Sequence, residues 1–238
     1  MQAEFRRAFI ENARRRGSNL ILALDTTDWN KAQRVLAEAA DNITAVKVHP
    51  EHADIWGFSH ESAILTLKRL GNGVPVILDA KIADIDKNNA MKTEYYLTKG
   101  YDAIISHGFQ GEKAVEAVLA SANKLKKGVF LLAAMSSPGH MFKKEVVEEI
   151  AAIANKLDVA GVIAPGNQYD LLSSIRKLVG ENILILSPGI GAQGGDAEKA
   201  FKAGANFAIV GRSIVDSANP AEESLKLKNV LGGNMPLC

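Results

Sequence analysis

The stretch Val76-Ile77-Leu78-Asp79-Ala80-Lys81-Ile82-Ala83-Asp84 joins an apolar strand directly to three charged residues. Successive side chains alternate across a strand, so Asp79 and Lys81, two positions apart, are expected on one face. Asp84 follows three residues later, where the strand is expected to have ended. Burying a carboxylate beside an ammonium costs about as much free energy as it returns. The pair therefore indicates either a structural ion pair or a functional site.

This stretch is one of eight apolar runs, each followed by an amphipathic segment. The runs are continuously apolar rather than alternating, which is typical of parallel strands buried on both faces. The expected strands cover residues 20–25, 43–48, 75–81, 103–106, 129–134, 159–163, 183–186 and 207–210. The expected helices cover residues 28–40, 87–99, 112–126, 144–156, 169–179 and 197–203, with two more that begin at Ser59 and near Pro220.

Eight strand–helix units predict an α/β fold, the (β/α)8 TIM barrel, as a single domain over residues 1–238. An open doubly wound sheet is the second architecture to consider, but eight regular units favour closure. Residues 1–16 carry Phe5, Phe9 and Ile10 at helical spacing and predict an N-terminal capping helix. Residues 232–238 are expected to form a loose tail.

Composition limits the partners of this chain. The sequence is 47% hydrophobic and 23% charged, an ordinary globular balance. Its 28 basic and 27 acidic residues give a net charge of +1, so no global basic field suggests nucleic acid. Apolar runs are too short to predict a membrane span. The N-terminus lacks an apolar signal core, and the single cysteine, Cys238, suits a reducing cytosol, so we expect a cytoplasmic protein.

The functional site of such a barrel lies at the C-terminal ends of its strands. Charged side chains stand at three neighbouring strand ends, and their convergence on one mouth is hard to explain as surface charge. His49 and His107 are interpreted as strand-end hydrogen-bonding residues rather than catalysts. The side chains expected at the mouth are Asp25, Lys47, His49, Asp79, Lys81, Asp84, Ser106, His107, Ser136 and Arg212.

The loops after the last two strands predict a phosphate site. Glycines in residues 187–196 let backbone N–H groups approach an anion, and Arg212 in Gly211-Arg212-Ser213 can contact two phosphate oxygens. Barrels frequently bind phosphate at these two loops. The alternative is that the glycines only make a flexible turn. A phosphorylated small substrate reacting over a Lys/Asp cluster is the function that these residues favour.

Other ligands are not indicated. The run Gly189-Ile190-Gly191-Ala192-Gln193-Gly194 resembles a dinucleotide fingerprint, but that motif belongs in the first strand–helix turn of a Rossmann unit. The chain has no Gly-x-x-x-x-Gly-Lys-[Ser/Thr] nucleotide loop and no obvious Cys/His metal spacing. We therefore expect neither a cofactor nor a bound metal.

The chain resembles orotidine 5'-monophosphate decarboxylase from about residue 20 to about residue 220. The motif Asp-x-Lys-x-x-Asp is shared with metal-dependent sugar-phosphate relatives, so the loop Pro-Gly-Ile-Gly-Ala-Gln-Gly-Gly-Asp and the tripeptide Gly-Arg-Ser are the more specific part. The matching pieces are Leu24-Asp25, Val46-Lys47, Asp79-Ala80-Lys81-Ile82-Ala83-Asp84-Ile85, His107-Gly108-Phe109, Met135-Ser136-Ser137-Pro138-Gly139, residues 187–196 and Val210-Gly211-Arg212-Ser213.

The resemblance implies cofactor-independent decarboxylation of orotidine 5'-monophosphate to uridine 5'-monophosphate and CO2, a step of de novo pyrimidine biosynthesis. It implies that Lys81 protonates C6 and that Asp79 lies next to the substrate carboxylate. Lys47 would hydrogen-bond Asp79 and the ribose, and Asp25 would bind a ribose hydroxyl. Asp84 would reach into the site of the partner subunit, which makes the homodimer the functional unit.

The remaining implied substrate contacts come from the loops. Ser136 would contact the pyrimidine edge. Gln193, Gly211 and Arg212 would hold the phosphate, and Pro188 and Asn88 are also expected among the substrate-binding residues. One departure is visible, because Asp86 and Asn88 replace a proline and a threonine of the family pattern. Asp86 can cap a helix instead, and Asn88 can still donate a hydrogen bond to a ribose or across the dimer.

Other functions remain open at this point. A Mg²⁺-dependent sugar-phosphate lyase of the same superfamily, such as 3-keto-gulonate-6-phosphate decarboxylase or hexulose-phosphate synthase, shares Asp-x-Lys-x-x-Asp and would be sensitive to EDTA. A catalytically silent barrel that serves as a binding subunit would not need Lys47, Asp79, Lys81 and Asp84 together. Schiff-base chemistry would need a neutral lysine, which the adjacent carboxylates oppose.

Overall fold

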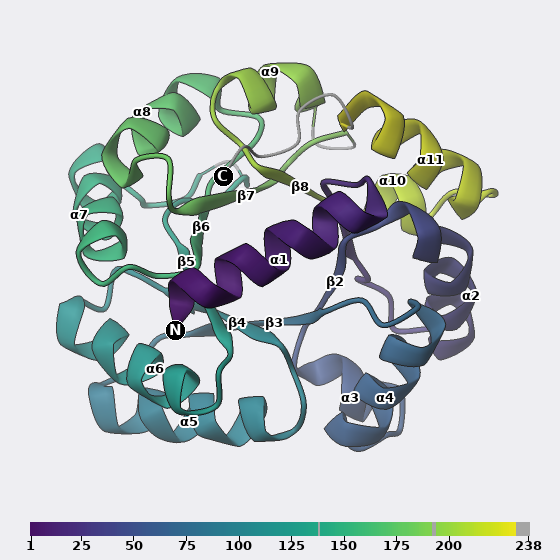
Figure 1. The fold of residues 1–238 in the computed structure, drawn as a ribbon, viewed down its shortest axis with the longest axis horizontal. Helices are drawn as coiled ribbons and strands as arrows, with labels where there is room; N and C mark the ends of the chain where they lie inside the picture. The colour runs from purple at the N-terminus through teal and green to yellow at the C-terminus, as the bar shows by residue number, and fades with distance from the viewer. Residues whose placement is uncertain (138, 192–193, 232–238) are drawn as a thin grey trace.

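Eight parallel strands close into a barrel, and each strand pairs with its neighbours in chain order (Figure 1). This computed structural model describes residues 1–137, 139–191 and 194–231. Leu22 of the first strand lies opposite Val210 of the last, which closes the sheet. The predicted TIM barrel is confirmed, and the open doubly wound sheet is wrong. The strands are β1 (Leu20–Ala23), β2 (Ala45–Val48), β3 (Val76–Ile82), β4 (Ala103–His107), β5 (Gly128–Leu132), β6 (Gly161–Ile163), β7 (Leu184–Pro188) and β8 (Phe207–Val210).

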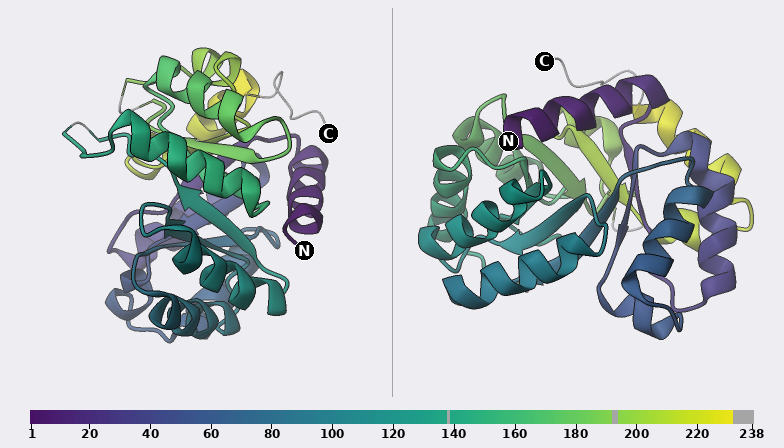
Figure 2. Two further views of the ribbon diagram at one scale, coloured as in Figure 1. Left: turned by 90° about the vertical axis from the view of Figure 1, so that its left-hand side faces the viewer. Right: turned by 60° about the horizontal axis from the view of Figure 1, so that its bottom comes forward.

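Helices surround the barrel, as Figures 1 and 2 show. Two of them, α7 and α8, begin and end at the predicted residues. The short helices α3 and α10 were not predicted, because four or five residues are too few to show a helical period. The helices outside the barrel are α2 (Trp29–Ala39), η1 (Ala40–Asn42), α3 (Glu51–Ile55), α4 (His60–Leu70), α5 (Asp86–Thr98), α6 (Glu112–Lys124), α7 (Lys144–Lys156), α8 (Tyr169–Val179), α9 (Ala197–Lys202), α10 (Arg212–Val215) and α11 (Pro220–Leu231).

The core has two layers. One lies between the strands and the surrounding helices, and the other fills the barrel. Helix α1 (Gln2–Arg16) lies across the N-terminal end of the barrel, which Figure 2 shows from the side. Its Phe9 packs against Phe207 and Phe130, with ring centroids 5.0 and 6.1 Å away. The predicted capping helix is therefore confirmed, whereas the tail over residues 232–238 lies outside the described residues.

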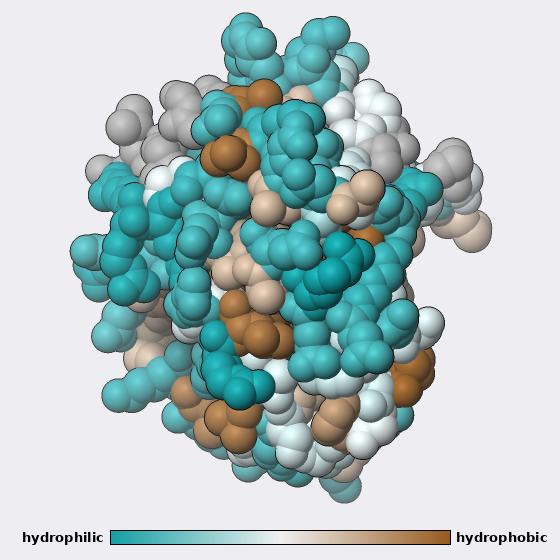
Figure 3. Space-filling model, turned by 90° about the vertical axis from the view of Figure 1, so that its right-hand side faces the viewer, coloured by the Kyte–Doolittle hydropathy of each residue, from teal (hydrophilic) through white to brown (hydrophobic). Residues whose placement is uncertain are grey.

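The side of the molecule that carries α2 and α11 is mostly hydrophilic, with small apolar areas between the polar side chains (Figure 3). Lys31 pairs there with Asp216 at 2.7 Å, and Lys226 with Glu222 at 2.8 Å. Exposed pairs of this kind contribute little to stability. None of the helices in the described part of the chain is long and apolar enough to cross a membrane.

Strand β3 leaves regular geometry at the end where the charged residues stand. It pairs with β4 through Leu78 opposite Ile104, and next through Ile82 opposite Ser106. Between these two pairings the chain moves four residues along β3 but only two along β4. Within this bulge Lys81 has a φ of 43°, in the left-handed region that non-glycine residues seldom adopt. A bulge bends a strand and re-aims its side chains. Asp79 and Lys81 therefore meet through a bulge rather than through simple alternation.

Candidate active site

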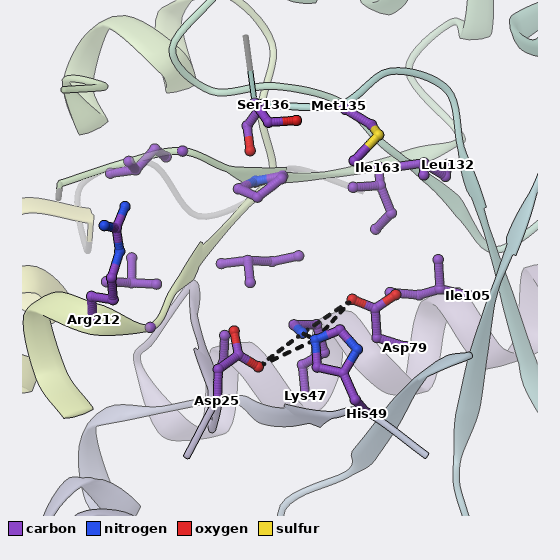
Figure 4. Close-up of a pocket in the computed structure, with 18 of the residues that line it drawn as sticks. Asp25, Lys47, His49, Asp79, Ile105, Leu132, Met135, Ser136, Ile163 and Arg212 are labelled. Atoms are coloured by element: carbon purple, nitrogen blue, oxygen red, sulfur yellow. Dashed lines mark hydrogen bonds and ion pairs between the residues drawn. The ribbon is translucent and has the colours of Figure 1, made fainter. Parts of the chain in front are cut away.

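A pocket of about 260 Å³ opens at the C-terminal ends of the strands. Its walls come from opposite sides of the barrel, and Figure 4 shows Asp25, Lys47 and Asp79 on one side with Ser136 across from them. The strand-end location is the predicted one. Of the predicted site residues, the structure brings together Asp25, Lys47, Asp79, Lys81, Ser136, Pro188, Gly211 and Arg212 around this pocket.

The charged side chains form an alternating row. Lys47 Nζ donates to Asp79 Oδ2 at 3.1 Å and to Asp25 Oδ1 at 3.3 Å. On the other side of Asp79, Lys81 Nζ lies 2.8 Å from Oδ1. The side chains of Lys47 and Asp79 are only 7% and 9% exposed. Two carboxylates thus offset two ammonium groups, and Lys81 occupies the open end of the row with its side chain 36% exposed.

Both carboxylates of the row are ionised at neutral pH. Burial alone would raise the pKa of Asp79, but the charges of Lys47 and Lys81 more than offset this effect and hold the pKa below its usual value. Burial would likewise raise the pKa of Asp25. A hydrogen bond with His49 and the charge of Lys47 hold that pKa well below its usual range. The row therefore offers fixed charges of both signs at the pocket.

His49 joins this row, although the sequence pattern indicated only a strand-end hydrogen-bonding role. Its Nε2 lies 3.1 Å from Lys47 Nζ and 3.4 Å from Asp25 Oδ1. The ring lines the pocket beside both residues (Figure 4). Its place at the mouth was predicted, whereas its contacts with Lys47 and Asp25 were not.

His52 and Trp56 form an aromatic brace behind the row, which the sequence pattern did not predict. The backbone N–H of His49 donates to His52 Nδ1 at 3.3 Å, and the His52 ring stacks on Trp56 with centroids 4.9 Å apart. Trp56 Nε1 in turn donates to the backbone oxygen of Thr26 at 3.0 Å. Burial lowers the pKa of His52 and keeps its ring neutral, as an accepting Nδ1 requires. The brace connects the loop after Asp25 to the backbone of His49.

The wall opposite the row comes from the loops after β5 and β6. Asn167 Nδ2 donates to the backbone oxygen of Ser136 at 3.2 Å. Gly189 stands against both residues, because a Cβ on it would lie 3.1 Å from atoms of Asn167 and Ser136. Its φ of 93° also excludes most other residues. Ser136 is therefore held over the pocket by contacts from two neighbouring loops.

The glycine-bearing loop after β7 reaches the pocket through Gly189, and its role as a phosphate site stays a prediction. Gly191 and Gly194 have φ values of 78° and 85°, and their N–H groups donate within the loop, to the Gly195 and Gly191 oxygens at 2.9 and 2.8 Å. Arg212 stands at the start of α10, and its guanidinium lies at the pocket edge, away from the charged row (Figure 4). Gln193, the third predicted phosphate ligand, lies outside the described residues.

Asp84 and Asn88 lie apart from the pocket within this chain. The Asp84 carboxylate pairs with Lys92 at 2.8 Å and accepts from Asn88 Nδ2 at 3.0 Å. The Lys92 hydrogen bond is the largest of the contacts that lower the pKa of Asp84 to about 2. Asp86 does not cap α5 as suggested. It is the first residue of the helix, and its carboxylate accepts from the next backbone N–H, that of Lys87, at 2.8 Å.

Metal ligands do not converge in the described ranges 1–137, 139–191 and 194–231, where no group of three or more His, Cys, Asp or Glu side chains could hold an ion. These ranges assemble a fixed row of charges on one side of the pocket, and Gly211 and Arg212 line its edge. This arrangement suits a small anionic substrate whose reaction develops charge near Lys81.

Fold and site together define a (β/α)8-barrel enzyme with a charged pocket at the C-terminal ends of its strands. The model of the orotidine 5'-phosphate decarboxylase / HUMPS family matches residues 18–227, and the chain belongs to this family. Its similarity to named relatives extends over nearly all of both chains. It is 37% identical to orotidine 5'-phosphate decarboxylase of Methanococcoides burtonii over 211 residues, covering 88% of this chain and 95% of the relative. It is 40% identical to that of Thermococcus kodakarensis over 213 residues, with the same coverage.

Solved structures agree with the sequence relatives. Orotidine 5'-monophosphate decarboxylase from Methanocaldococcus jannaschii, complexed with the inhibitor BMP, superposes with a TM-score of 0.82 at 34% identity. The match covers 90% of this chain and 98% of that one. The corresponding enzyme from Pyrococcus horikoshii gives a TM-score of 0.79, also at 34% identity, over 89% of this chain and 98% of that one. The resemblance read from the motifs is thereby confirmed.

Proposed function

We propose that this chain decarboxylates orotidine 5'-monophosphate to uridine 5'-monophosphate and CO2 without a cofactor, as a cytoplasmic step of pyrimidine biosynthesis. The observation that carries the proposal is the row Asp25–Lys47–Asp79–Lys81 at the mouth of a barrel of this family. A row of fixed charges is what the reaction needs, because its barrier lies in separating charge at one carbon atom.

Lys81 is the residue that meets the reacting carbon. The bond between C6 and the carboxylate breaks with its electron pair left on C6, in an sp² orbital outside the ring π-system, and CO2 departs. The Lys81 ammonium stabilises the developing negative charge and then transfers a proton from Nζ to C6. Its position at the open end of the row, 2.8 Å from Asp79, supports this assignment.

Asp79 aligns Lys81 and lies against the departing carboxylate. At about 4 Å and an effective dielectric constant of about 20, two like charges repel by about 4 kcal/mol. That energy corresponds to roughly three powers of ten in rate, whereas enzymes accelerate slow reactions by up to ~10¹⁷-fold or more. Repulsion by Asp79 is therefore a minor part of the rate acceleration. The preorganised ammonium of Lys81 and the binding energy of the remote phosphate supply more of it.

The rest of the nucleotide has a place along the pocket. Asp25 and Lys47 bind the ribose hydroxyls, and Ser136 contacts the pyrimidine from the opposite wall. Arg212 holds the phosphate together with Gly211, Pro188 and the predicted Gln193. Because the phosphate is distant from C6, its binding energy can close the loops after β5 and β7 over the substrate.

A homodimer completes the proposed site, with Asp84 of each subunit entering the pocket of its partner and Asn88 beside it. The Asp84 side chain is 30% exposed, and apolar side chains next to it and next to Gln110, which holds its N–H, are exposed as well. Among these, Ile85 is 64% exposed and Phe109 is 55% exposed. Exposed apolar area of this kind favours a protein interface. Within a dimer, Asp84 would exchange some of its contacts with Lys92 and Asn88 for contacts across the interface.

An absorbance assay with orotidine 5'-monophosphate, run with and without EDTA, tests the proposal. We expect the pyrimidine absorbance to change at the same rate in both conditions. The matched comparison is 3-keto-gulonate 6-phosphate with Mg²⁺, on which we expect no turnover. EDTA-sensitive activity on that sugar phosphate, with no activity on the nucleotide, would show instead that the chain is a metal-dependent sugar-phosphate lyase.

A further inference from the structure

Ser106 and Gln110 contact the backbone at and just beyond the end of β3, shortly after the left-handed Lys81. Ser106 is fully buried on β4, and its Oγ donates to the Ile82 oxygen at 2.9 Å. Gln110 lies in the loop after β4, and its Oε1 accepts from the Asp84 N–H at 2.9 Å. The two side chains thus hold the backbone one and three residues beyond Lys81.

These two side chains also bind each other. Gln110 Nε2 donates to Ser106 Oγ at 3.0 Å and to the backbone oxygen of His107 at 2.9 Å. The Ser106 hydroxyl therefore donates to β3 and accepts from Gln110, so both of its hydrogen-bonding functions are used. A buried polar network that is satisfied in this way fixes one geometry. Here that geometry ties the end of β3 to β4 and its loop.

The backbone of Lys81 needs such support. A residue with a side chain stays in the left-handed region only where its surroundings over-determine it. The bulge between Leu78 and Ile82 leaves Lys81 outside the regular pairing of β3 with β4. The first pairing after the bulge is Ile82 opposite Ser106, which is where the Ser106 hydroxyl also acts. Relaxation of Lys81 would require Ile82 and Asp84 to move against this network.

We infer that Ser106 and Gln110 are positioning residues that clamp the bulged end of β3, so that Lys81 points into the pocket while Asp84 faces away from it. Neither side chain lines the pocket, so both act through the residues they hold. The inference rests on the proposed function, because it assigns the clamp to the reaction that Lys81 carries out. Nothing in the Asp-x-Lys-x-x-Asp motif encodes it, since both residues come from the next strand–helix unit.

The test uses variants of each clamp residue. Ser106→Ala removes the hydroxyl that holds Ile82, and Gln110→Leu, at a half-buried position, removes the acceptor for Asp84. Ser121→Ala is the matched control, because Ser121 is also buried and its hydroxyl donates to a carbonyl, that of Ala90 at 3.3 Å, away from the pocket. Ser106→Thr retains a hydroxyl in a residue type that suits strands and should restore the clamp.

We expect Ser106→Ala and Gln110→Leu to lower kcat for orotidine 5'-monophosphate by roughly 10- to 100-fold, the size expected when a reacting group is misplaced by about 1 Å. KM should change much less than kcat, because the ribose contacts of Asp25 and Lys47 and the phosphate contact of Arg212 lie on other elements. Ser106→Thr should recover most of kcat, and Ser121→Ala should retain it. Amide hydrogen exchange at Asp84 should become faster in both clamp variants.

The clamp is overturned if Ser106→Ala and Gln110→Leu lower the melting temperature as Ser121→Ala does, yet keep the kcat of the parent. A failure of the proposed function is distinguishable from this result. In that case the parent itself does not turn over the nucleotide, and amide hydrogen exchange at Asp84 alone tests the clamp. An Asp84 amide that stays as protected in both variants as in the parent would then contradict it.

Discussion

Lys81 combines a backbone conformation that few residues with side chains adopt and an ammonium 2.8 Å from a buried carboxylate. Either feature alone has an ordinary structural explanation. Together they place strain and charge at the same residue, at the mouth of the pocket, where stored strain and preorganised charge are often part of a mechanism. At this scale the function depends on where one nitrogen atom is held.

Replacing Lys81 tests this dependence directly. Lys81→Ala should lower turnover by more than about 10²-fold, because it removes both the stabilising charge and the proton donor. Binding of uridine 5'-monophosphate, measured by calorimetry, should persist, since the ribose and phosphate contacts remain. Lys156→Ala breaks an exposed pair with Glu112 and should leave turnover intact. A Lys81→Ala enzyme with near-parental turnover would remove this residue from the chemistry.

The lowered pKa of Asp79 predicts how the stability of the fold depends on pH. Its pKa is lowered in the folded chain, so the folded state binds fewer protons than the unfolded state in the interval between the two pKa values. The stability that this carboxylate contributes is therefore fully present above the ordinary Asp pKa of about 3.9 and is lost as the pH falls through the depressed value. Between pH 5 and 8 this contribution should stay constant.

Unfolding free energies measured between pH 3 and pH 8 check this sign. Asp79→Asn should lose less stability below about pH 4 than the parent does, because an amide cannot take up a proton there. Asp170→Asn, an exposed change on α8, serves as the surface control. If the unfolding free energy of Asp79→Asn fell as steeply below about pH 4 as that of the parent, Asp79 would not govern stability in acid.

At the scale of elements, the proposed phosphate contact and the proposed proton donor lie on different parts of the barrel: Arg212 begins α10 after β8, whereas Lys81 lies on β3. Arg212→Ala should weaken binding of uridine 5'-monophosphate far more than binding of uridine, because a guanidinium recognises phosphate through paired hydrogen bonds. Calorimetric titration of both ligands measures the difference. An equal loss for both ligands would exclude Arg212 from the phosphate site.

The regular elements were predictable because their signals are local. Helix α7 and the caps Asp28 and Ser59 follow from periodicity and side-chain chemistry within one segment. The bulge in β3 was not predictable, because it depends on Ser106 and Gln110, which the chain supplies from the next unit. The residues of the pocket followed from strand ends, whereas their distances and the contribution of His49 required the three-dimensional structure.

At the scale of the whole molecule, the proposed homodimer would share each site between two chains. Lys81→Ala and Asp84→Asn should each give a weakly active enzyme. If Asp84 serves the partner's pocket, a mixed dimer of the two variants contains one site with neither defect. Mixing the variants under conditions of subunit exchange should then restore activity at roughly a quarter of all sites, given statistical pairing of the subunits.

The mixing experiment discriminates between shared and self-contained sites. Each variant mixed with itself is the control and should gain nothing. If Asp84 acted only within its own chain, every site of the mixed dimer would carry one defect, and activity would not return. The rate of orotidine 5'-monophosphate decarboxylation after mixing is the measurement.

Helix α1 seals the floor of the barrel, with Phe9 pressed against Phe130 and Phe207. If Lys81 acts as proposed, carbon dioxide forms with these packed aromatic rings below it and the nucleotide above it. It would then leave through the mouth of the pocket, by which the substrate enters. On the proposed function, release of carbon dioxide is therefore coupled to opening of the pocket mouth, which would serve for both entry and exit.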